Sequence, residues 1–190
     1  VGQDSKADGI KYQDGKNRVL NTLHTFDAAF GKFWEYFKTS PYAKNTIVIV
    51  TADHAHWPER EYIKIAGKDF NRTPIDKIAL FINSPAHNFP KVFNATNLTS
   101  IAFAPTVSQL LNLSHRQNHF LGYSIFDNRK LTESVAWFNR DLYVIDREGE
   151  LSHYKVDGEL PEPVNKLWNG LRRSHHAELN DQMLPFADEG

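Results

Sequence analysis

The chain has 190 residues, of which 41% are hydrophobic and 24% charged, with a formal net charge of −1. This length is sufficient for a domain with a hydrophobic core. The nearly balanced charge argues against a nucleic-acid binder, which would usually carry a basic stripe. No apolar run approaches the roughly 18 residues of a membrane span, and the absence of cysteine excludes disulfides, thiol catalysis and cysteine-ligated zinc.

The first part of the chain is predicted to be a lead-in followed by a long helix. Residues 1–16 are rich in Gly, Asp and Lys, which is typical of a flexible segment, and contain no signal peptide. Six apolar residues then recur at alternating spacings of four and three, which predicts an amphipathic helix: Val19, Leu23, Phe26, Phe30, Phe33 and Phe37. Ser40-Pro41 ends this helix.

The middle of the chain alternates strands and helices. The β-branched run Ile47–Val50 predicts a strand buried on both faces. A polar loop is predicted over residues 54–70 and a second strand over residues 77–82. Pro105 fits the first turn of a helix that extends to about Asn112. The alternation predicts an α/β architecture.

The last third has a different pattern. Residues 135–146 and 151–156 flank a Gly-containing turn and are predicted to form an antiparallel hairpin. Pro163 is expected to open a helix that extends to about Leu179. We therefore predict an α/β part over residues 17–128 and a hairpin-plus-helix tail over residues 129–190.

Asp53 and His54 are the strongest candidates for chemistry because they follow the first strand directly. Ligands of α/β proteins bind beyond the carboxyl ends of strands, and a carboxylate next to an imidazole suits a divalent metal ion. The alternative is that Asp53 only caps backbone amides in a strand-to-loop turn.

Two further residues of the following loop are candidate substrate contacts. His56 is expected to contact substrate, to orient a ligand or to bind a second ion; alternatively, it is an exposed loop histidine. Arg60 can hold an anionic oxygen through two hydrogen bonds, although such an arginine more often lies in solvent or pairs with Glu59 or Glu61.

These motifs, in this order, resemble the alkaline phosphatase and sulfatase superfamily. The pattern Asn-Thr, apolar strand, Thr-x-Asp-His resembles its metal-binding strand, and the likeness is closest to lipoteichoic acid synthases and other bacterial phosphoglycerol transferases. Further segments that resemble this family over residues 17–157 are Asp27-x-x-Phe30, Asn71-Arg72-Thr73-Pro74, Ala104-Pro105-Thr106-Val107 and Gly122-Tyr123-Ser124. One departure is Ala102, which stands where the family has a helix-opening Asp.

The resemblance implies the carboxyl-terminal part of an alkaline phosphatase-like α/β/α sandwich, here with an antiparallel hairpin and a terminal helix. Asp53 and His54 would be metal ligands for Mn²⁺, Mg²⁺, Ca²⁺ or Zn²⁺, and Arg72 would lie in a loop near the substrate. The family's nucleophile and remaining ligands are expected upstream, so no catalytic nucleophile is assigned here and the chain alone is expected to be inactive.

The implied activity is cleavage or transfer of phosphate or sulfate esters, with a phospholipid head group as a candidate donor. A membrane-anchored parent would then work on the extracytoplasmic face of a bacterial cytoplasmic membrane, and the fragment itself is expected to be soluble. The alternatives are a sulfuric ester hydrolase, a phosphoethanolamine transferase and a non-catalytic sulfatase-fold binding domain. Apolar surface left by part of an α/β sheet predicts self-association.

Overall fold

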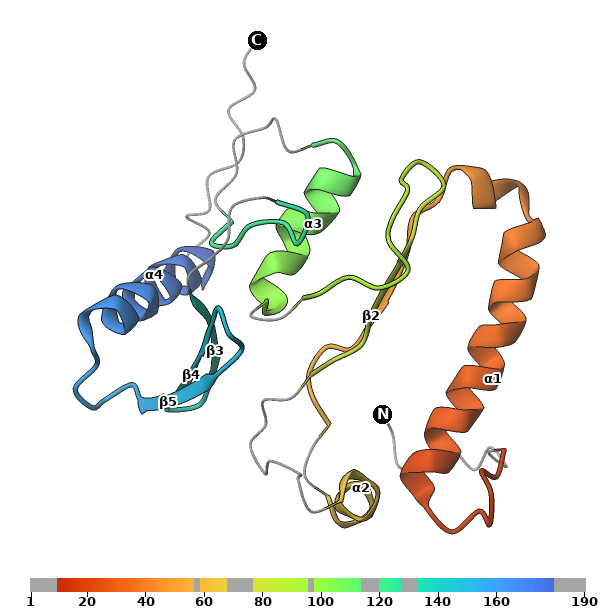
Figure 1. The fold of residues 1–190 in the computed structure, drawn as a ribbon, viewed down its shortest axis with the longest axis horizontal. Helices are drawn as coiled ribbons and strands as arrows, with labels where there is room; N and C mark the ends of the chain where they lie inside the picture. Colours follow the sequence, from red (N-terminus) through yellow and green to blue (C-terminus); the bar gives the residue numbers. More distant parts are fainter. Residues whose placement is uncertain are drawn as a thin grey trace. The chain divides into compact units, whose positions relative to one another are not determined.

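The computed structural model describes residues 10–56, 59–67, 77–95, 98–113, 120–127 and 133–179. The chain divides into two compact units, residues 1–91 and 92–190. The boundary predicted near residue 128 marks a change in the pattern of helices and strands, whereas the division at residue 91 marks two compact units. The predicted boundary stays a prediction. Figure 1 shows the elements of each unit in chain order.

Unit 1 begins with the predicted amphipathic helix, α1 (Arg18–Thr39). Asn17 caps it, because its Oδ1 accepts a hydrogen bond of 3.0 Å from the backbone N of Leu20. Ser40 ends it and leads into the 3₁₀ helix η1 (Pro41–Lys44). The prediction of this helix and of its end is confirmed.

The apolar stripe of α1 forms a ladder of aromatic rings. The ring centroids of Phe26 and Phe30 are 6.3 Å apart, those of Phe30 and Phe33 5.8 Å, and those of Phe33 and Phe37 5.7 Å. Phe37 is buried, whereas Phe26 is 60% exposed. The ladder therefore stabilises the helix internally but leaves much apolar area in contact with water.

The predicted strands form a two-stranded antiparallel sheet, β1 (Val48–Thr51) and β2 (Leu80–Asn83), with Val48 opposite Asn83 and Thr51 opposite Leu80. The prediction that the first strand is buried on both faces is wrong, because its residues are half-buried or exposed. Within the described residues β2 is the one strand that pairs with β1. The apolar run therefore predicts the strand correctly, but it does not predict how far other elements cover the two faces of the strand.

The predicted loop after β1 contains a helix, α2 (Arg60–Ala66), so the loop prediction is wrong over these residues. Gly67 ends the helix with φ of +79°, a conformation that glycine adopts at little cost. The side-chain amide of Asn17 donates a hydrogen bond of 3.0 Å to the backbone O of Glu61, which ties α2 to the start of α1. Seven residues are too few for a clear helical period.

Unit 2 begins with η2 (Ser100–Ala102) and α3 (Phe103–Leu110), which contains Pro105 in its first turn as predicted. The helix ends earlier than predicted, since Asn112 has φ of +58°. Thr106 is buried, and its hydroxyl donates to the backbone O of Ala102 (2.6 Å) and accepts from the backbone N of Ile125 (3.0 Å). This hydroxyl fastens a distant segment to α3.

A three-stranded antiparallel sheet follows, with the order β3 (Glu133–Phe138), β4 (Asp141–Asp146) and β5 (Leu151–Lys155). The prediction of one strand over residues 135–146 is wrong, because a two-residue turn divides it into β3 and β4. Asn139 has φ of +55° in this turn, and asparagine tolerates that conformation better than most residues. The second turn, with Gly149 at φ of +88°, confirms the predicted hairpin.

The terminal helix α4 (Glu162–Leu179) is confirmed within a residue of its predicted start. It packs on one face of the three-stranded sheet, and the buried core there consists of Val135, Leu142, Val144 and Val164. The architecture is mixed α/β, as predicted. Across the described part of the chain, every helix is too short or too polar to cross a membrane.

Candidate metal centre

Asp53 and His54 lie just beyond the carboxyl end of β1, as the sequence predicted. Oδ2 of Asp53 is 3.6 Å from Nε2 of His54. Oδ1 of Asp53 accepts a hydrogen bond of 3.0 Å from the backbone N of His54. The hydrogen bond to the backbone and the contact with the imidazole thus involve different oxygens of one carboxylate, and the two side chains lie side by side.

The donor atoms of this pair fit one divalent ion. Nδ1 of His54 is 2.6 Å from the backbone O of Ala55, so Nδ1 donates this hydrogen bond, and Nε2 is the ring nitrogen that lies 3.6 Å from Oδ2 of Asp53. Two tetrahedral ligands of Zn²⁺ at about 2.0–2.2 Å would stand roughly 3.3–3.6 Å apart, and Oδ2 and Nε2 are 3.6 Å apart; the smaller angle between octahedral ligands of Mg²⁺ or Mn²⁺ would require the two side chains to move closer together. Among the described residues there is no group of three or more His, Cys, Asp or Glu side chains able to hold a metal.

His56 is held by two residues that the sequence did not connect with it. Its Nε2 is 3.6 Å from Oε1 of Glu59, and its ring stacks on Tyr62 with a centroid distance of 4.2 Å and an angle of 7°. Glu59 precedes α2 and Tyr62 lies in its first turn. The short helix therefore fixes the orientation of this imidazole, and Gly67 was the one feature of the sequence that marked its end.

The substrate contacts predicted for Arg60 and Arg72 both stay predictions. Arg60 is exposed at the first position of α2, and no described carboxylate forms an ion pair with it. A hydrogen bond from Lys64, with the nearby charges of Lys64 and Arg60, lowers the pKa of Glu61 below its ordinary value. Arg72 lies outside the described residues, and its substrate contact stays a prediction.

The family model described as Sulfatase matches residues 3–113, more than half of the chain. The chain belongs to the sulfatase family. The match confirms the superfamily resemblance and spans α1, β1, the Asp53–His54 pair, α2, β2 and α3. The resemblance of residues 122–126 lies beyond the matched range and stays a prediction. No curated protein and no solved structure matches the chain.

Proposed function

We propose that Asp53 and His54 are two ligands of a divalent-metal centre in an enzyme that cleaves or transfers phosphate or sulfate esters. The observation that carries this proposal is the 3.6 Å between Oδ2 and Nε2 at the carboxyl end of β1, in a chain that belongs to the sulfatase family. Mn²⁺, Mg²⁺, Ca²⁺ and Zn²⁺ all accept such oxygen and nitrogen ligands.

The residues around the pair have complementary roles in this proposal. A bound ion stabilises negative charge on a phosphoryl or sulfuryl oxygen. Asp53 balances the charge of the ion, and the carbonyl of Ala55 keeps Nε2 of His54 turned toward it. His56, oriented by α2, donates a hydrogen bond to an ester oxygen, and Arg60 and Arg72 bind the remaining anionic oxygens. The nucleophile is not assigned to this chain.

For the substrate, we propose transfer of a phosphoglycerol group from an anionic phospholipid to an acceptor alcohol, on the extracytoplasmic face of a bacterial membrane. The support is the similarity of the Asp-His strand and its flanking motifs to phosphoglycerol transferases. A sulfuric ester hydrolase is the alternative enzyme. A non-catalytic binding domain is the alternative outside enzymes, and Ala102 in place of the family's Asp favours it slightly.

Metal titration of the purified chain tests the proposal. We expect one Mn²⁺ per chain with weak affinity, in the micromolar-to-millimolar range, because two ligands leave most of the coordination sphere to water. Asp53→Ala and His54→Ala should each abolish this binding. Asp27→Ala is the matched control, since Asp27 is an exposed aspartate on α1. Undiminished Mn²⁺ binding by Asp53→Ala would refute the metal role.

A further inference from the structure

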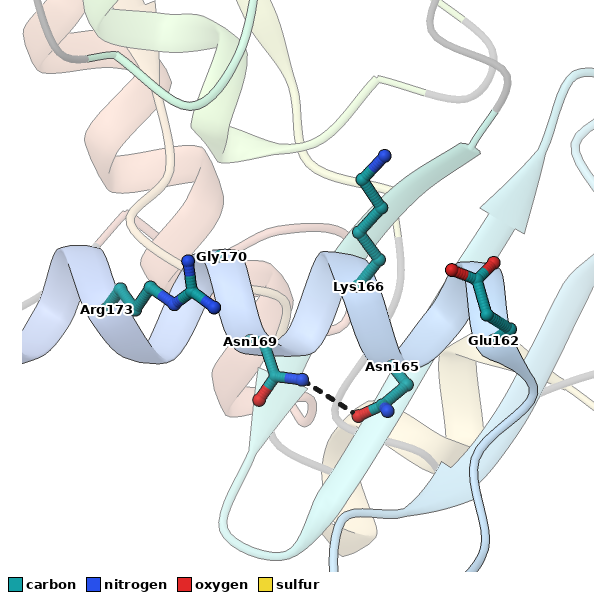
Figure 2. Close-up of a pocket in the computed structure, with 6 residues that line it drawn as sticks. All are labelled: Glu162, Asn165, Lys166, Asn169, Gly170 and Arg173. Atoms are coloured by element: carbon teal, nitrogen blue, oxygen red, sulfur yellow. Dashed lines mark hydrogen bonds between the residues drawn. The ribbon is translucent and has the colours of Figure 1, made fainter.

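Two hollows adjoin on α4 in unit 2. One, of about 470 Å³, follows the helix surface past Glu162, Lys166, Gly170 and Arg173 (Figure 2). The other, of about 510 Å³, lies between α4, the start of β3 and the segment before α3. Glu162, Lys166 and Gly170 line both hollows, so the two form one depression with two different halves.

The second hollow is mainly apolar. Its aliphatic side chains come from four separate segments of the unit: Leu98, Ile101, Leu121, Val135, Leu167 and Leu171. A concave volume of this size falls within the roughly 300–1,000 Å³ of sites that bind small molecules. This half is therefore suited to an apolar chain.

The rim carries charges of both signs. Lys166 and Arg173 are positive, and Glu133 and Glu162 are negative. Glu162 and Lys166 stand four residues apart on α4, a spacing at which such residues commonly pair, yet Figure 2 shows their charged groups apart. Within the described residues none of the four charges has an ion-pair partner. A head group with one positive and one negative charge complements this rim.

Gly170 forms a notch where the two halves meet. It lies inside α4, where glycine is less favourable than alanine. A Cβ at this position would meet no atom within 4 Å. Packing against the described residues therefore does not require a glycine at position 170. Because glycine has no side chain, a molecule in the depression can approach the helix backbone here.

We propose that this depression binds a zwitterionic amphiphile, a molecule with a single apolar chain and a head group that contains a phosphate and an ammonium. The chain occupies the aliphatic half, and its first carbons cross the notch at Gly170. The phosphate contacts Lys166 and Arg173, and the ammonium faces Glu162 and Glu133. This site is separate from Asp53 and His54 and does not depend on the metal proposal.

Calorimetric titration of the full chain with dodecylphosphocholine below its micelle concentration tests the proposal. Dodecyl maltoside, with the same apolar chain and an uncharged head, is the comparison. We expect the zwitterion to bind roughly tenfold more tightly, the effect of two charge-assisted contacts at a partly exposed site. The double variant Lys166→Gln/Arg173→Gln should lose this preference while it still binds the maltoside.

Two glycine substitutions distinguish binding at the notch from nonspecific adsorption of the amphiphile to the protein surface. Gly170→Leu should weaken the binding of both amphiphiles at least about tenfold. Gly31→Leu is the matched control, because Gly31 is also inside a helix with no atom within 4 Å of its Cβ position, and it should bind like the wild type. Gly170→Ala should raise the melting temperature of the free protein by about 2–4 °C, which verifies that the helix tolerates a side chain there.

Two outcomes would overturn the proposal. One is equal affinity for the two amphiphiles, which indicates adsorption driven by the apolar chain alone. The other is an equal loss of binding in Gly170→Leu and Gly31→Leu, or no loss in either. Asp53→Ala should leave the titration unchanged, so a failure of this proposal is distinguishable from a failure of the metal proposal.

Discussion

Gly122→Ala should destabilise unit 2 because the site has no room for a methyl group. Gly122 is buried, and a Cβ there would lie 2.7 Å from Cγ2 of Ile101 and 2.8 Å from its backbone O. Real Cβ atoms essentially never approach other heavy atoms closer than 3.0 Å. A rotation of the Ile101 side chain relieves the first contact, but the second requires η2 itself to move.

The magnitude follows from two opposing effects. Overpacking of a well-packed site costs about 1–3 kcal/mol. Alanine in place of glycine also restricts the unfolded chain, which offsets about 0.4–1 kcal/mol of that cost. We therefore expect the free energy of unfolding to fall by about 1.3 kcal/mol, within a range of about 0–2.6 kcal/mol. In a protein of this size each kcal/mol corresponds to about 2–4 °C in melting temperature.

Urea unfolding monitored by circular dichroism provides the measurement. Gly170→Ala is the control in the same unit, since its Cβ meets no atom within 4 Å. The midpoint for Gly122→Ala should fall below that of the wild type, and the midpoint for Gly170→Ala should rise. Equal midpoints for the two variants would refute the steric argument and the packing of residue 122 against η2.

Three further predictions concern single side chains. Thr106→Val keeps the shape of the side chain but leaves a backbone amide without its acceptor, so the free energy of unfolding should fall by about 1–3 kcal/mol in urea titrations. Hydrogen bonds from Lys155 and His153 lower the pKa of Asp141 in the folded protein. The contribution of Asp141 to stability is therefore fully present above the ordinary pKa of an aspartate, and it is lost as the pH falls through the lowered pKa of the folded state. Melting temperatures between pH 6 and pH 2 should accordingly fall less for Asp141→Asn than for the wild type. Phe33→Glu should reduce self-association in sedimentation velocity experiments, because Phe33 is 46% exposed on the aromatic ladder of α1.

Elements with a complete local pattern were predictable from the sequence. For α1 the spacing of the apolar residues and the break at Ser40-Pro41 both indicate the same helix. For α4 the proline near its start marked the boundary. In each case the residues that decide the element lie within it or next to it, so no knowledge of tertiary contacts was needed.

Other features depend on contacts that no local pattern reveals. The burial of β1 is set by which elements cover it, and its β-branched run is compatible with full or partial burial. The turn between β3 and β4 has no glycine, and Asn139 adopts the left-handed conformation in its place. The stacking of His56 on Tyr62 depends on α2, and the sequence pattern, which predicts a loop over residues 54–70, does not reveal it.

The exposure of the Asp53–His54 pair bears on how such a centre would work. The Asp53 side chain is 88% exposed and that of His54 is 54% exposed. At a separation of 4 Å the attraction between unit charges is about 1 kcal/mol in bulk water and about 4 kcal/mol near a protein surface with lower effective dielectric. In the proposed metal centre, any group that covers the pair and excludes water would therefore strengthen the attraction between Asp53 and a bound ion. Under this proposal the end of β1 determines which two side chains would bind the ion, and the groups around them would determine how tightly they bind it.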